Sequence, residues 1–89
     1  MVQLQLWEQF FSDGSIQSDG CSLHIDKMSR DSYITENFNS NSERPVGLET
    51  EVEVSDEIFD IVLNQKNIRL SEVELNNLLN MKIINPIYD

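Results

Sequence analysis

Residues 46–66 read VGLETEVEVSDEIFDIVLNQK, and their apolar periodicity changes at Ser55. Before Ser55, apolar and acidic residues alternate, which is typical of a strand with one buried face. After it, apolar residues recur at helical spacing, and Ser55 is a good N-cap ahead of Asp56 and Glu57. We therefore predict a strand over 46–54, with Leu48, Val52 and Val54 buried, and a helix over 56–66.

A second helix is expected shortly after the first. Ser71 and Glu74 have the spacing of a capping box, and Pro86 disfavours helix at the residue before it. We predict a helix over 72–81. The two helices have the spacing of a helix-turn-helix, but the second lacks any Lys or Arg before Lys82. DNA readers need such cations, so a packed pair of helices is favoured.

The N-terminal third is less clear, because residues 2–11 fit both a helix and a strand. Two Ser-Asp-Gly sequences, at 12–14 and 18–20, favour tight turns between short antiparallel strands. We predict three such strands over about 3–26, then a short helix over about 30–38 with Ser29 as its N-cap. Residues 1–89 then form a single small α+β domain, with an antiparallel sheet of about four strands and a C-terminal pair of helices.

The amino-acid composition excludes several classes of function. Among 89 residues, 16 are acidic and 6 are basic, which gives a net charge of −10. Direct binding to nucleic acid or to an anionic membrane is disfavoured, because both depend on Lys and Arg. No apolar run approaches the length of a membrane span, and the N-terminus lacks the layout of a signal peptide. The single Cys21 cannot form an internal disulfide, so we expect a cytoplasmic protein.

Candidate catalytic residues are few. Ser22, His24 and Asp26 have the residue types of a catalytic triad and share one face of a strand. Neighbours on that face lie about 6.6 Å apart, too far for a relay, so we expect His24 to be a surface histidine. Cys21 and His24 fall on opposite faces, and these residues are too few for a zinc site. We predict no catalytic residue, no metal, no cofactor and no enzymatic activity.

The segment over 45–65 is more acidic than the rest of the chain. It contains no base and six acids, namely Glu49, Glu51, Glu53, Asp56, Glu57 and Asp60. The three Glu lie on one face of the predicted strand, where their like charges oppose folding. They form either a solvated face or a partner-binding surface that imitates a phosphate backbone and enters the groove of a basic, nucleic-acid-binding protein. By size and charge alone, without a shared motif, the chain is similar to small phage or mobile-element proteins that block host nucleases, the anti-restriction and anti-CRISPR kind.

Aromatic residues gather near the N-terminus, where Trp7, Phe10 and Phe11 fall within five positions. In a strand, Trp7 and Phe11 share the face opposite Phe10. A place in the core is favoured, but an exposed face would be a partner or homodimer surface, so Trp7 and Phe11 are also candidate contact residues. We therefore predict a non-enzymatic acidic binding or inhibitor protein. The alternative is an adaptor or immunity-type protein that binds one protein partner, or itself, through an apolar N-terminal strand.

Overall fold

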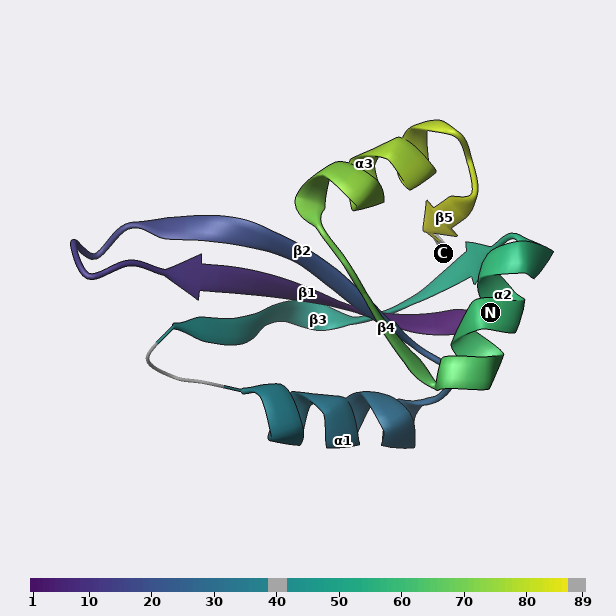
Figure 1. The fold of residues 1–89 in the computed structure, drawn as a ribbon, viewed down its shortest axis with the longest axis horizontal. Coiled ribbons are helices and arrows are strands. Elements are labelled where there is room, and N and C mark those ends of the chain that lie inside the picture. Colours follow the sequence, from purple (N-terminus) through teal and green to yellow (C-terminus); the bar gives the residue numbers. More distant parts are fainter. Residues whose placement is uncertain (39–41, 87–89) are drawn as a thin grey trace.

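The computed structural model describes residues 1–38 and 42–86, apart from the side chains of residues 48, 49 and 86. It shows a small α+β fold, which confirms the predicted class. The elements in chain order are β1 (Val2–Phe10), β2 (Ile16–His24), α1 (Lys27–Asn37), β3 (Glu43–Val54), α2 (Asp56–Gln65), β4 (Asn67–Leu70), α3 (Glu72–Asn80) and β5 (Ile84–Pro86). In the described part of the chain, the sheet has five antiparallel strands in the order β4-β2-β1-β3-β5, rather than about four (Figure 1).

The two Ser-Asp-Gly sequences have different roles. The first lies in the turn over 11–15 that joins β1 to β2, where Gly14 has a φ of +87°. The second lies inside β2, so the three short strands predicted over 3–26 are in fact two long ones. The prediction was wrong because Asp-Gly indicates a need for positive φ, and a β-bulge satisfies that need as well as a turn does.

The bulge lies in the middle of β2. Asp19 and Gly20 together lie opposite Trp7 on β1. Gly20 has a φ of +76°, and a Cβ atom there would collide with the carbonyl oxygen of Leu70. Only glycine therefore fits this position, where β2 comes close to the end of β4.

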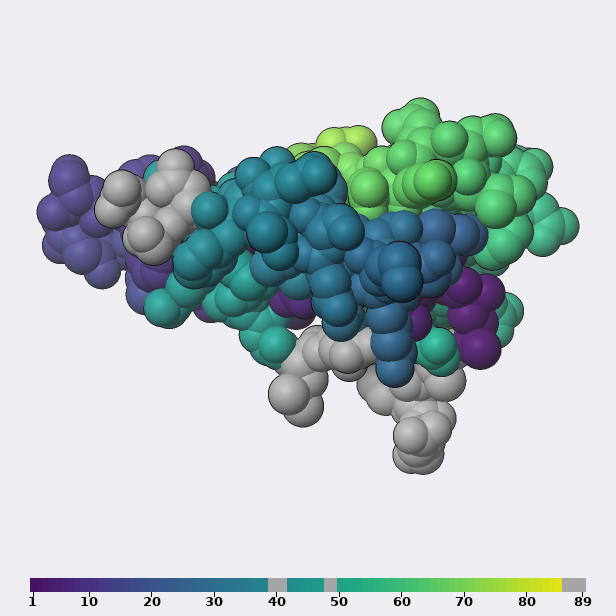
Figure 2. Space-filling model, turned by 90° about the horizontal axis from the view of Figure 1, so that it is seen from below, coloured from purple at the N-terminus to yellow at the C-terminus, as the bar shows by residue number. Residues whose placement is uncertain are grey.

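The two faces of the sheet differ in chemistry, because successive side chains of a strand point to opposite sides. We call one side the apolar face; its buried residues are Val2, Leu4, Cys21, Leu23, Val52, Leu70 and Ile84. Helices α2 and α3 complete the core on this side through Val62 and Leu75. Both helices form where they were predicted, but strand β4 joins them instead of a turn and β5 follows them, so the predicted C-terminal pair is matched only roughly. We call the other side the polar face; it carries Gln3, Gln5, Trp7, Ser22, His24, Asn67 and Arg69. Helix α1 covers part of the polar face (Figures 1 and 2).

Helix α1 starts earlier than predicted. Its N-cap is Asp26, whose carboxylate accepts a hydrogen bond from the Ser29 backbone nitrogen at 2.7 Å. Ser29 itself lies within the first turn, so its prediction as the N-cap was wrong. An aspartate three residues upstream is at least as good a cap as serine, and it decides where the helix begins.

Helix α3 has the predicted capping box. The Ser71 hydroxyl accepts from the Glu74 backbone nitrogen at 3.1 Å, and the Glu74 carboxylate accepts from the Ser71 backbone nitrogen at 3.2 Å. We expect Ser71→Ala to lower the free energy of unfolding by about 1 kcal/mol, because one backbone donor loses its acceptor. Urea denaturation measures this change. An unchanged midpoint would show that the cap contributes nothing.

Candidate functional site

Strand β3 exposes two of the predicted acids. Glu51 and Glu53 are exposed, while Val52 between them is buried, as the alternation predicted. Val54 is half-buried, and the side chains of Leu48 and Glu49 lie outside the described part of the structure. Glu51 pairs with Gln3 across to β1 and Glu53 with Asn85 across to β5, so both acids lie on the polar face. Their strand, β3, is next to β1, which is one of the three strands that α1 contacts together with β2 and β4.

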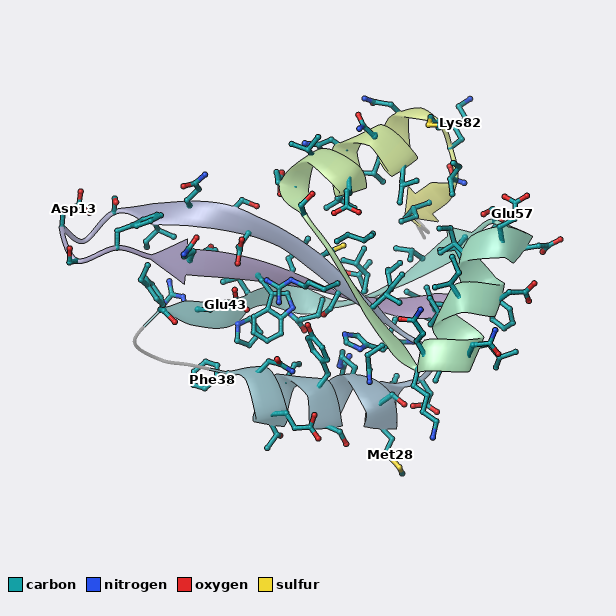
Figure 3. The ribbon with its side chains drawn as sticks, viewed as in Figure 1. Asp13, Met28, Phe38, Glu43, Glu57 and Lys82 are labelled. Atoms are coloured by element: carbon teal, nitrogen blue, oxygen red, sulfur yellow. The ribbon has the colours of Figure 1, made fainter. Side chains whose placement is uncertain are left out.

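The other three predicted acids lie on α2. Asp56 and Glu57 occupy its first turn, Asp60 follows one turn later, and all three are exposed. Glu57 projects outward at the end of the molecule opposite the hairpin tip that carries Asp13 (Figure 3). We call these five described residues the acidic surface. It extends over two sides of the sheet, because Glu51 and Glu53 lie on the polar face, whereas Asp56, Glu57 and Asp60 lie on α2, which packs on the apolar face.

The arginines neutralise acids elsewhere in the molecule. The ion pairs are Arg69 with Asp19 and Glu43 at 3.2 and 3.0 Å, Arg44 with Glu8 at 3.5 Å, and Arg30 with Asp31 at 2.8 Å. These are all three arginines of the chain. Within the described residues, no member of the acidic surface forms an ion pair with a base; Glu51 accepts one hydrogen bond, from Gln3 Nε2 at 3.2 Å. Five negative charges are thus left without a cationic partner.

Part of the acidic surface has a structural explanation. Asp56 and Glu57 lie in the first turn of α2, where the helix dipole favours negative charge. Glu51 and Glu53 gain nothing from a helix dipole. Glu51 accepts one hydrogen bond from Gln3, but two like charges on one face of a strand repel each other. The fold therefore accounts for the position of Asp56 and Glu57 but not for that of the strand pair.

Trp7 is not a surface residue, contrary to one of the predictions. Its side chain is fully buried, and its indole nitrogen donates to the Ser22 hydroxyl at 2.9 Å. The Arg69 guanidinium lies 4.8 Å from its ring centre, and the Tyr33 ring packs edge-on at 5.9 Å. This burial follows from the central place of β1 in the sheet and from the cover that α1 provides. Phe11 is 42% exposed and stays a candidate contact residue.

Ser22 and His24 contact each other, although their spacing suggested that they would not. The Ser22 Oγ lies 2.7 Å from His24 Nε2, and both residues are fully buried. The prediction of a surface histidine was therefore wrong, because α1 covers this face. Asp26 takes no part, since it caps α1. Asn67 takes the place that an acid would have beside His24 in a catalytic triad; its side-chain amide lies 2.7 Å from His24 Nδ1.

The hydrogen-bond acceptors around Asn67 determine which ring nitrogen of His24 carries the hydrogen. The carbonyl oxygens of Ser29 and Lys66 lie 3.2 Å from the Asn67 amide nitrogen, so this nitrogen faces them and also faces His24 Nδ1. His24 then accepts at Nδ1 and donates from Nε2 to the Ser22 hydroxyl. A serine nucleophile would need an unprotonated Nε2 instead. Burial lowers the pKa of His24, and the positive charge of Arg30 lowers it further, which keeps the ring neutral. The cluster is therefore a packed polar network.

Cys21 is buried on the apolar face, and this burial raises the pKa of its thiol to about 12. The thiol is therefore protonated and is a poor nucleophile. Across the described residues, no group of three or more His, Cys, Asp and Glu side chains could hold a metal ion. None of the described helices is long and apolar enough to cross a membrane.

An apolar pocket of about 200 Å³ opens between α3 and the sheet. It is lined by Leu4, Leu6, Thr50, Val52, Leu75, Leu79 and Ile84. Leu6 is 42% exposed although it belongs to the central strand. The sequence pattern did not indicate this pocket, because it depends on how α3 lies across strands that are distant in sequence.

Comparison with known proteins identifies no relative of this chain. No family model matches it, and neither does any curated protein or solved structure. The functional argument therefore depends on the residues and contacts of the chain itself.

Proposed function

We propose that this chain is a non-enzymatic binding protein whose acidic surface binds a basic protein, at a site that otherwise holds nucleic acid. One observation carries the proposal. All three arginines form ion pairs with acids elsewhere, and the five exposed acids of this surface form no ion pair with a base in the described structure. Uncompensated like charges disfavour the compact state. A basic partner would supply the missing cations on binding.

The geometry of the strand pair suits such a partner. Glu51 and Glu53 are two residues apart on one face, so their backbone positions are about 6.6 Å apart. A regular row of carboxylates can imitate a phosphate backbone and be steered into a basic groove by charge. An inhibitor of a nuclease would act by occupying that groove. A single buried cysteine, Cys21, fits action in the cytoplasm, where disulfides are rare.

The proposal is tested by capturing partners from a lysate of the native host on the immobilised chain. We expect the captured proteins to be basic and to bind nucleic acid. Their association rate constants should fall at least about tenfold between 0.1 and 1 M salt, because the Debye length shrinks from about 10 to about 3 Å. Neutral or acidic partners, or association rates that change less than about twofold, would contradict the proposal.

A second candidate is an adaptor or immunity-type protein that binds through apolar contacts near the N-terminal hairpin. The apolar pocket and the exposed side chains of Leu6, Phe11 and Ile16 favour it. Strand β1 pairs on both sides, so its side chains, and not its backbone, would have to make the contact. Such binding should depend little on salt. A homodimer would bring together two chains of charge −10, and charge opposes that arrangement.

A further inference from the structure

We propose that neutral His24 is a latch that holds α1 on the polar face of the sheet, and that protonation of His24 at mildly acidic pH releases α1. This inference goes beyond the proposed binding function and does not depend on it. It concerns the histidine that lies where β2, β4 and α1 meet.

His24 links these three elements directly. On β2 its Nε2 donates to Ser22, and toward β4 its Nδ1 accepts from Asn67 at 2.7 Å. The ring of Tyr33 in α1 packs against the imidazole, with 5.1 Å between ring centres. The Asn67 nitrogen also lies 3.2 Å from the carbonyl oxygen of Ser29 in the first turn of α1. One neutral imidazole thus fixes the amide that holds the start of α1.

Protonation breaks this arrangement. An imidazolium carries a hydrogen on both ring nitrogens, so Nδ1 and the Asn67 nitrogen would become two donors facing each other at 2.7 Å. If the amide turned to offer its oxygen to Nδ1, that oxygen would instead face the carbonyl oxygens of Ser29 and Lys66. The first case forces the Asn67 amide away from His24, and the second removes its hydrogen bond to the Ser29 carbonyl oxygen of α1.

The charged neighbours do not compensate for a proton on the ring. Helix α1 contributes Arg30, whose positive charge opposes protonation, and Tyr33. Strand β4 contributes Arg69, which is held by Asp19 and Glu43. Strand β1 presents only uncharged residues on this face, namely Gln3, Gln5 and Trp7. Among the described residues, no carboxylate bonds to the ring.

In the described part of the structure, helix α1 buries little apolar surface beyond the contacts of Tyr33 with Trp7 and His24. Its one buried residue is Arg30, and its apolar side chains Tyr33 and Ile34 are only half-buried. Helices α2 and α3, by contrast, each bury an apolar residue in the core, Val62 and Leu75 respectively. The docking of α1 therefore depends on polar contacts to a greater extent than the docking of the other two helices.

The direction of the pH effect follows from linkage. Burial places the pKa of His24 in the folded protein below its usual value of 6.5. The contribution of neutral His24 is therefore complete above pH 6.5 and is lost as the pH falls through the folded pKa. Burial also raises the pKa of Glu43 above its usual value, so the titration of this carboxyl has to be separated from that of His24. Asp26 has a lowered pKa and stays charged over the range in which His24 titrates.

Amide hydrogen exchange at pH 7.5 and 5.5, corrected for intrinsic rates, tests the latch. We expect the protection factors of residues 27–37 to fall several-fold relative to residues 72–80 at the lower pH, with a limit of about tenfold that follows from the ordinary histidine pKa of 6.5 in the released state. We also expect ¹⁵N NMR at pH 7.5 to show the His24 proton on Nε2. An unchanged ratio of protection factors, or a proton on Nδ1, would overturn the proposal without the need for any variant.

Two variants separate His24 from Glu43. His24→Gln keeps a polar side chain but cannot titrate, so protection of α1 should be equal at the two pH values. Asn67→Asp places a carboxylate beside Nδ1 that accepts from the imidazolium, so protection of α1 should stay level or rise as the pH falls. A loss as large as that of the wild type in either folded variant would assign the effect to Glu43 or another group, and the latch would be wrong.

Discussion

Replacement of Glu51 and Glu53 by lysine is expected to raise the Kd for the basic partner at least about a hundredfold, because like charges brought together at an interface cost several kcal/mol. Both side chains are exposed, so the fold should survive. The free energy of unfolding should change by about 1 kcal/mol or less, mainly because Gln3 loses its hydrogen bond to Glu51. Calorimetric titration with the captured partner and urea denaturation measure the two quantities.

A matched control separates the acidic surface from net charge. The triple variant Glu36→Lys, Asn76→Lys and Asn80→Lys changes exposed residues of α1 and α3. It raises the net charge from −10 to −6, as the strand variant does. Glu72 and Glu74 are unsuitable controls, because Glu72 bonds to β2 and Glu74 completes the capping box of α3. If the control weakened binding as much as the strand variant, only the overall charge would matter.

Trp7→Ala is expected to lower the free energy of unfolding by about 3–5 kcal/mol, the usual cost of truncating a large buried aromatic residue. The indole is fully buried, donates to Ser22 and packs against Arg69 and Tyr33. A domain of this size has a total stability of roughly 4–13 kcal/mol, so the loss is a large part of the whole. Circular dichroism should follow the unfolding, because Trp7 is the only tryptophan and the variant lacks its fluorescence.

Phe11→Ala is the comparison for this variant. Phe11 is 42% exposed in the turn after β1, so its truncation should cost about 1 kcal/mol or less. A loss below about 1 kcal/mol for Trp7→Ala as well would mean that the indole is not part of the core. Trp7 would then return as a candidate for partner contact.

Local signals predicted the elements that depend on local chemistry. The alternation over 46–54 and the caps Ser55 and Ser71 act within a few residues, and β3, α2 and α3 lie where these signals placed them. The same kind of signal misled at Gly20. Its positive φ belongs to a bulge in β2 opposite Trp7 of β1, close to the end of β4, and the neighbouring sequence does not indicate either strand.

The sequence failed mainly to predict which residues of the polar face are buried, and the reason applies to other proteins as well. Burial was inferred from apolar character, but Gln3, Gln5, Ser22 and His24 are all buried under or beside α1. Polar residues can be buried when they bond to one another, and the partner that decides the case for His24 is Asn67, 43 residues away. No periodicity in a single sequence reveals such a pair.

The candidate site was predicted in part. Exposure of Glu51 and Glu53 follows from alternation, and exposure of Asp56 and Glu57 from their place at the start of a helix. The arginine pairs that leave these acids uncompensated could not be predicted. Arg69, for example, reaches Asp19 across 50 residues. The feature that favours a binding role therefore comes from the tertiary structure.

The most direct test of the acidic surface is whether the chain and duplex DNA compete for the captured partner. The partner, held on fluorescently labelled DNA at 0.1 M salt, is titrated with the wild type and with the variant that replaces Glu51 and Glu53 by lysine. We expect the wild type to displace the DNA fully and the variant to leave it bound at the same concentration. A ternary complex, in which the partner holds the chain and the DNA together, would contradict the proposal that the acidic surface occupies a nucleic-acid site.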